Sequence, residues 1–201
     1  EPEKLVVEEQ PDPEPGPGQV VVAVAAAGVN FVDALFVAGT YQIKVPPPFT
    51  PGSELAGTVV AVGDGVDQVA VGDRVLSSLG LGAFASHVVV SARSVTPVPA
   101  NLSDAAAAAL AQSYCTAWFA LTRRTTVTPG ETVLVLGAGG GVGLAAIDVA
   151  TALGARVIAA ASTAEKLADA TAMGAAATIA YEDEDLKARA RELADGQLDV
   201  V

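Results

Sequence analysis

Cysteine, histidine and basic residues are scarce in this chain. Of its 201 residues, one is cysteine, Cys115, and one is histidine, His87. A single cysteine cannot close an internal disulfide, and with one histidine it cannot supply the thiolate and imidazole ligands of a typical zinc site. Lys and Arg number 11 against 23 Asp and Glu, so the formal net charge is −12. A chain this acidic is expected to bind neither nucleic acid nor an anionic membrane surface.

Long hydrophobic runs and aromatic side chains are also few. The uncharged stretch 132–147 is too short and too rich in glycine to cross a bilayer, and no basic leader precedes the apolar stretch 20–29. Hydrophobic residues make up 51% of the chain but aromatics only 4%, so we expect a core of small side chains such as alanine and valine. The composition predicts a soluble, cytoplasmic protein without a membrane partner.

Residues 130–150 carry the most informative pattern, GETVLVLGAGGGVGLAAIDVA. The β-branched run 132–136 predicts a strand buried on both faces, and residues 144–153 predict a helix that ends at Gly154. The glycines between them leave the backbone open to a ligand's phosphates, and the start of the helix offers N–H groups with a partial positive charge. A second strand expected at 156–161 completes the context of a dinucleotide-binding turn.

The dinucleotide fingerprint appears here as Ala138, Gly140 and Gly143, with alanine in place of the first glycine. The alternative is a glycine-rich turn that binds no ligand. Because a strand precedes the turn and a helix and a second strand follow it, the sequence favours a dinucleotide site.

The end of the second strand distinguishes the two nicotinamide cofactors. Proteins that bind NAD place an acidic residue about 20 residues after the first glycine, where it binds the ribose hydroxyls. Ala161 stands at that place, followed by Ser162 and Lys166. Small hydroxyl side chains and a cation suit a 2′-phosphate, so the sequence predicts NADPH. The alternative for Lys166 is an ordinary solvated lysine on a helix.

The two halves of the chain differ in their residue patterns. The first hundred residues contain short β-branched runs separated by turn clusters, which predicts a small antiparallel β domain. From Asn101 the pattern becomes helical, with Ser103 expected to cap a helix over 104–121. We place the boundary between residues 1–111 and 112–201. The predicted strands are 20–26, 55–62, 73–77, 84–90 and 177–180, with another beginning at 198–201; two further helices are predicted at 164–173 and 182–193.

Four segments together resemble the zinc-free quinone oxidoreductases, the zeta-crystallin-like family of the medium-chain dehydrogenase/reductase superfamily. They are 25–41 (AAAGVNFVDALFVAGTY), 48–63 (PFTPGSELAGTVVAVG), 71–75 (VGDRV) and the glycine-containing stretch 130–163. The resemblance implies an α/β chain, with a GroES-like antiparallel β domain followed by a Rossmann domain with a doubly wound parallel sheet, and an active site between them. Members of the family are longer, so we expect this chain to be truncated, with the Rossmann domain incomplete at its C-terminus.

The resemblance also bears on metal and reaction. Zinc-dependent relatives carry cysteine where this chain has Asn30 and histidine where it has Ser53, and His87 is expected to be an ordinary strand residue. We therefore expect no metal, and a hydride transfer from NADPH to a small-molecule quinone or related conjugated carbonyl. Some quinone reductases have a tyrosine where this chain has Leu35, so reduction of an enone or enoyl thioester stays open. A non-catalytic, crystallin-like NADPH-binding role is the other alternative.

The resemblance implies three catalytic residues. Asn30 would lie near the nicotinamide ribose and the acceptor oxygen, Tyr41 would donate a proton in the substrate pocket, and Thr116 would lie beside the nicotinamide. Tyr41 and Tyr181 are alternatively packing aromatics, and Thr116 a helix residue bonded to its own backbone. Members of the family often dimerise, so the resemblance leaves a homodimer of the full-length protein open. The implied cofactor-binding residues are Asn30, Thr116, Ala138, Gly140, Gly141, Val142, Gly143, Ser162, Lys166 and Tyr181.

Overall fold

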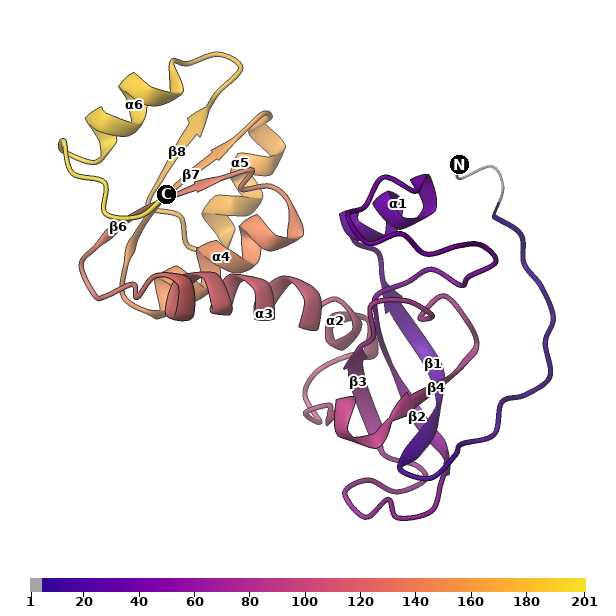
Figure 1. The fold of residues 1–201 in the computed structure, drawn as a ribbon. Helices are drawn as coiled ribbons and strands as arrows, with labels where there is room; N and C mark the ends of the chain where they lie inside the picture. Colours follow the sequence, from indigo (N-terminus) through magenta and orange to yellow (C-terminus); the bar gives the residue numbers. More distant parts are fainter. Residues whose placement is uncertain (1–4) are drawn as a thin grey trace. The chain divides into compact units, whose positions relative to one another are not determined.

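The computed structural model describes residues 5–201, which form two compact units, one ending at Gln112 and one running from Ser113 to Val201 (Figure 1). Each unit has its own sheet and its own core. Within residues 5–201, no helix has the length and apolar character needed to cross a membrane.

The first unit is built on a five-stranded antiparallel sheet in the order β4-β1-β2-β3-β5. Alternate residues of its long strands, such as Val20, Val22 and Val59, are fully buried and form the core with Leu55 and Val75. The antiparallel β domain is therefore confirmed. Its strands are β1 (Gln19–Gly28), β2 (Glu54–Val62), β3 (Arg74–Ser78), β4 (His87–Ser91) and β5 (Val95–Pro97).

The helices of this unit are short. They are α1 (Phe31–Ala38), the 3-10 turn η2 (Ala92–Ser94) and α2 (Asp104–Ala108). Ser103 caps α2 by accepting the N–H of Ala106, as predicted. The buried residues Ala107 and Ala108 of α2 pack against Ala56 and Leu76 of the sheet.

The second unit contains a three-stranded parallel sheet in the order β6-β7-β8. Alternate residues of β7 lie on opposite faces, since Val157 and Ala159 belong to the cluster that includes α4 residues, and Ile158 belongs to the cluster that includes Ala190 of α6. Both faces are thus covered by helices, which confirms the doubly wound arrangement (Figure 1). The elements are α3 (Ala111–Phe119), the π-helical turn η3 (Ala120–Arg124), β6 (Thr132–Leu136), α4 (Gly141–Ala152), β7 (Arg156–Ala161), α5 (Ala164–Ala172), β8 (Ala177–Ala180) and α6 (Leu186–Leu193).

The single helix predicted over 104–121 is wrong, because the structure divides it into α2 and α3. The N–H of Gln112 donates to the carboxylate of Glu54 (2.7 Å). An N–H engaged with a side chain adds nothing to the helical ladder, so the regular helix is interrupted between Ala108 and Ala111.

Other boundaries also differ from the prediction. The β4 strand begins at His87 rather than at residue 84, because the N–H of Phe84 turns back to the carbonyl of Pro51 (2.9 Å). The α4 helix begins three residues earlier than expected, at Gly141. The α6 helix begins later than 182, because Asp185 accepts the N–H of Ala188 (2.8 Å) and so fixes the helix start.

The last residues pair with the edge of the parallel sheet. Val200 forms a parallel bridge with Val133 of β6, and its carbonyl accepts the N–H of Leu134 (2.9 Å). The extended segment predicted at 198–201 therefore lies beside β6, on the side opposite β7.

Candidate functional site

The glycine turn after β6 is tied to the neighbouring strand. The N–H of Ala138 donates to the carbonyl of Ala160 in β7 (3.0 Å), and Ala138 is fully buried. Gly137, with φ 64°, occupies the left-handed region that favours glycine. The turn is therefore held by backbone bonds, and Ala138 is accommodated where the fingerprint has its first glycine.

Gly143 allows α4 to pack directly on this turn. A methyl group on Gly143 would lie 2.4 Å from the carbonyl oxygen of Gly137 and 2.8 Å from the Cα of Ala138. Both contacts involve backbone, which cannot move aside like a flexible side chain. Gly143 is buried, so it shapes the turn and does not present itself to a ligand.

The start of α4 is open to an anion. Its N-cap is Gly140, which has no side chain to accept the N–H groups of the first turn, and that turn contains no acidic residue. Gly140, Gly141 and Val142 are exposed. Unpaired amides at a helix N-terminus carry a partial positive charge. The N–H of Gly140 donates to the carbonyl of Gly137 (3.0 Å), so the amides that can bind phosphate are those of Gly141 and Val142.

Three of the ten predicted cofactor residues, Gly140, Lys166 and Tyr181, lie at a hollow beside the turn. It is lined by Gly137, Gly139, Gly140, Ala161, Lys166 and Tyr181. Ser162 adjoins it, because its hydroxyl accepts a hydrogen bond from Nζ of Lys166 (3.1 Å). The sequence placed the whole glycine run at the ligand's phosphates, but Gly137 and Gly139 were not among the individually named cofactor residues.

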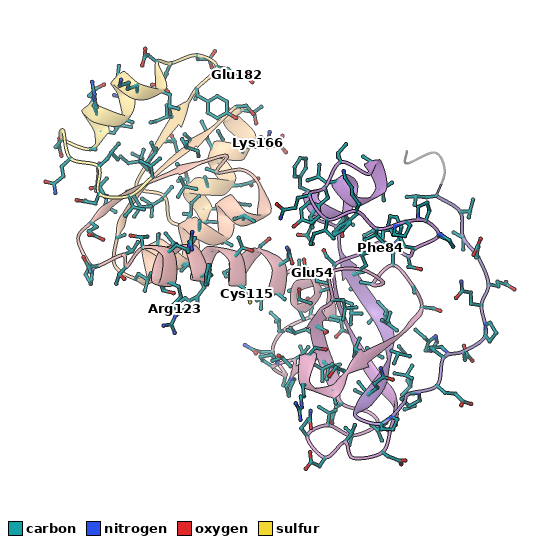
Figure 2. The ribbon with its side chains drawn as sticks, viewed as in Figure 1. Glu54, Phe84, Cys115, Arg123, Lys166 and Glu182 are labelled. Carbon is teal, nitrogen blue, oxygen red and sulfur yellow. The ribbon has the colours of Figure 1, made fainter. Side chains whose placement is uncertain are left out.

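Lys166 is held against the turn by packing as well as by Ser162. A methyl group on Gly139 would lie 2.5 Å from both Cβ and Cγ of Lys166, so the lysine stem crosses the space above that glycine. Figure 2 labels Lys166 in the second unit. Thr163 caps α5 by accepting the N–H of Lys166, which fixes the backbone from which the side chain extends. The arrangement places one ammonium group beside a strand end that carries no carboxylate.

Thr116 and two unpredicted residues lie on α3. Thr116 is exposed. The hydroxyl of Tyr114 donates to the carboxylate of Asp148 in α4 (2.8 Å), and burial, followed by that hydrogen bond and the charge of Asp148, raises the pKa of Tyr114. Ser113 is buried and adjoins Gly141, whose added methyl would lie 2.9 Å from the serine Oγ.

In the first unit, Asn30 belongs to a buried polar cluster. Its amide nitrogen donates to Oε1 of Glu54 (2.8 Å) and to the hydroxyl of Ser53 (3.3 Å). The other carboxylate oxygen of Glu54 accepts the N–H of Gln112, and Glu54, labelled in Figure 2, is only 1% exposed. Both N–H bonds of the amide are thus used within the unit. Sequence reasoning missed Glu54, for which an acid directly before the apolar run LAGTVVAV was the available signal.

Tyr41 and His87 occupy less constrained surroundings. The ring of Tyr41 packs at 4.6 Å, centroid to centroid, against Phe36 of α1, and the side chain is half-buried. His87, in β4, is half-buried with Nδ1 3.3 Å from the hydroxyl of Ser86. Among residues 5–201, no group of three or more His, Cys, Asp or Glu side chains is arranged to hold a metal ion.

The second unit therefore gathers Ala138, Gly140, Gly141, Val142, Gly143, Ser162, Lys166 and Tyr181 around one turn and the adjoining strand end. Asn30 and Tyr41 belong to the first unit, where α1 begins just after Asn30 and ends shortly before Tyr41.

Two family models match the chain. The one described as "Alcohol dehydrogenase GroES-like domain" matches residues 16–100, and the one described as "Zinc-binding dehydrogenase" matches residues 141–201. Among curated proteins, quinone oxidoreductase-like protein 2 homolog from Nematostella vectensis is 45% identical over 173 residues, covering 85% of this chain and 47% of the relative. The chain spans about half the length of the curated relatives named quinone oxidoreductase-like protein 2.

Solved structures agree with these matches. A probable oxidoreductase from Mycobacterium abscessus is 42% identical with a TM-score of 0.92, covering 99% of this chain and 64% of that one. Escherichia coli quinone oxidoreductase, solved in complex with NADPH, is 37% identical with a TM-score of 0.87, covering 97% and 60%. The CurK enoyl reductase is 30% identical with a TM-score of 0.87, covering 96% and 61%. On its sequence, its two sheets and these relatives, the chain belongs to the quinone oxidoreductase family of the medium-chain dehydrogenase/reductase superfamily.

Proposed function

We propose that the protein is an NADPH-dependent oxidoreductase that transfers a hydride to a quinone or related conjugated carbonyl without a metal. The observation that supports it most is the hollow beside the glycine turn, where Lys166 is held by Ser162 next to the methyl group of Ala161. A carboxylate at position 161 would bind ribose hydroxyls and repel a 2′-phosphate, whereas an ammonium attracts the phosphate. The similar E. coli enzyme was solved with NADPH.

Each unit has its own task in this proposal. Residues 112–201 hold the dinucleotide. The amides of Gly141 and Val142 bind the diphosphate, and Gly140, whose N–H donates to Gly137, leaves room for it by lacking a side chain. Ser162, Lys166 and Tyr181 surround the 2′-phosphate. When bound, the reduced nicotinamide supplies the hydride. Residues 1–111 supply the groups for the acceptor, with Tyr41 donating a proton as negative charge develops on the carbonyl oxygen.

The hydrogen bonds of the Asn30 side chain limit what it can offer to a ligand. Because its two N–H groups are directed to Ser53 and Glu54, the amide has no donor left for a developing oxyanion unless one of these bonds breaks. Its remaining capacity is that of an acceptor, which suits a ribose hydroxyl. In this proposal Tyr41 supplies the proton, Asn30 accepts from the cofactor ribose, and Thr116 contacts the nicotinamide.

The donor set also supports a reaction without zinc. The positions where zinc-dependent relatives carry cysteine and histidine hold Asn30 and Ser53, an amide and a hydroxyl that are hydrogen-bonded to one another. Zinc is held in proteins by thiolate, imidazole and carboxylate groups. Quinones and enones need little electrophilic help, since the charge that arrives with the hydride is delocalised onto oxygen.

A second candidate is an enone or enoyl-thioester reductase. Leu35, on the α1 helix that precedes Tyr41, places an apolar side chain where some quinone reductases have a second tyrosine. Such a pocket would bind one carbonyl oxygen better than the two oxygens of a quinone. The similarity to the CurK enoyl reductase supports keeping this candidate. A cytoplasmic location and a homodimer of the full-length protein are further parts of the proposal.

The test is a titration of the protein with NADPH and with NADH, followed by the decrease in absorbance of the reduced nicotinamide when an acceptor is added. We expect tighter binding of NADPH and oxidation driven by 1,4-benzoquinone. Faster turnover with a simple enone or crotonyl-CoA would favour the second candidate. Binding of NADPH without turnover on any of these acceptors would point to a non-catalytic role, and equal affinity for NADH would contradict the assignment of Lys166.

A further inference from the structure

Ser113 combines burial with an unused hydroxyl. It is 8% exposed and lies on α3 three residues before Thr116, so the two side chains project from the same side of that helix. Among residues 5–201, no hydrogen bond described for the protein involves its Oγ, and Oγ is not one of the fully enclosed polar atoms that lack a partner, so it keeps access to solvent. The serine therefore has hydrogen-bonding capacity that the fold does not use.

The hydroxyl is aimed at the start of α4. A methyl group built on Gly141, the first residue of that helix, would lie 2.9 Å from Oγ of Ser113 but 3.9 Å from its Cβ. The oxygen, rather than the carbon, is thus the atom of Ser113 nearest the helix N-terminus. That end of α4 lacks a capping side chain and an acidic residue, so the free amides of its first turn can bind an anion.

We propose that Ser113 is a binding residue for the diphosphate of the dinucleotide, donating its O–H to a phosphate oxygen held at the α4 N-terminus. The inference rests on the proposed function, since it takes the anion to be part of NADPH. A hydroxyl that donates to the diphosphate serves NADPH and NADH equally. Ser113 therefore contributes affinity, whereas Lys166 contributes the choice between the two cofactors.

The experiment compares Ser113→Ala with Lys166→Ala, measuring dissociation constants by calorimetry for three probes: NADPH, NADH and adenosine 2′-monophosphate. The last carries the 2′-phosphate but no diphosphate. We expect S113A to weaken both dinucleotides by the same factor, about tenfold for one hydrogen bond to a charged group, and to leave the monophosphate unchanged. K166A is expected to weaken NADPH and the monophosphate but not NADH.

A second pair of variants tests the geometry without removing the hydroxyl. Gly141→Ala places a methyl group against Oγ and should displace it, weakening both dinucleotides. In the S113A background the same methyl has only the 3.9 Å contact to Cβ, so we expect the combined loss to be clearly smaller than the product of the two single losses. Thermal unfolding of each variant shows whether the fold is retained.

The outcomes separate this inference from the function on which it rests. Wild-type protein that binds neither dinucleotide would overturn both. Two results would overturn the role of Ser113 while leaving the proposed function in place. One is an S113A variant that binds NADPH as tightly as the wild type does. The other is an S113A variant whose affinity for the monophosphate falls in parallel with its affinity for the dinucleotides.

Discussion

Replacing Glu54 by alanine should destabilise the first unit strongly. The carboxylate accepts from the Asn30 amide at 2.8 Å and from the Gln112 N–H at 2.7 Å, and it is 1% exposed, so water cannot take its place. A hydrogen bond to a charged acceptor contributes about 1.5–3 kcal/mol. Losing both bonds should therefore cost about 3–6 kcal/mol, a large part of the stability of a typical domain, about 5–15 kcal/mol.

The assay is urea unfolding followed by circular dichroism, with the free energy of unfolding obtained by linear extrapolation. Asp67→Ala is the matched control, because it removes one negative charge from an exposed position of the same unit and should change stability by no more than about 0.5 kcal/mol. Glu54→Gln should cost less than Glu54→Ala, because the glutamine oxygen still accepts one N–H and its amide can donate to a rotated Asn30. An alanine variant within about 1 kcal/mol of wild type would refute the reasoning from these bonds.

Three further predictions concern the turn, the proposed proton donor and the half-buried phenol of Tyr114. Gly143→Ala should lower both stability and dinucleotide affinity, because its methyl would meet the carbonyl of Gly137 at 2.4 Å; calorimetry showing unchanged affinity would contradict this. Tyr41→Phe should lower kcat by about 10²–10⁴-fold with little change in the dissociation constant of NADPH, and steady-state kinetics showing the reverse would reject the proton-donor role. The raised pKa of Tyr114 means that the folded state favours the neutral phenol, so stability should be kept below pH 10.0 and lost as the pH rises above it. Unfolding of Tyr114→Phe at alkaline pH should show a smaller loss than wild type, and an identical loss would assign the effect to another group.

Much of the fold could be predicted because its signals are local. The strand at 156–161 and the one at 177–180 appear in the structure with those bounds, since short apolar runs between a glycine and a helix cap leave little freedom. The central residues of β6 are buried on both faces, as predicted for 132–136, because Val133 and Val135 belong to one core cluster and Leu134 to another.

The misplaced boundaries have a different origin. The break between α2 and α3 depends on Glu54, which lies 58 residues away from Gln112 in the chain. The helix propensity of an alanine run depends on local residues alone, so it cannot predict this break. The start of α6 depends on which of several acids becomes the cap, and Asp185 takes that place rather than Glu182. Long-range hydrogen bonds and competing caps are decided by tertiary contacts, which one sequence does not display.

The residues of the candidate site also fall into those with local signals in the sequence and those that depend on long-range contacts. The glycines and Lys166 could be predicted because the backbone turn and the strand end are adjacent in sequence to the groups they position. The contacts of Glu54 and Ser113 could not, because each side chain lies against a partner in another element: Asn30 for Glu54 and Gly141 for Ser113.

The packing of Lys166 across Gly139 offers a route to changing cofactor choice by protein engineering. Redesign of nicotinamide preference usually exchanges charged side chains, and such exchanges alter the field of the whole site. Here the lysine stem occupies the volume that any larger residue at position 139 would need, so Gly139→Ala would displace the ammonium while leaving every charge in the protein intact. In evolutionary terms, the glycine at position 139 is needed as long as position 166 carries a long side chain. We therefore expect residues 139 and 166 to change together.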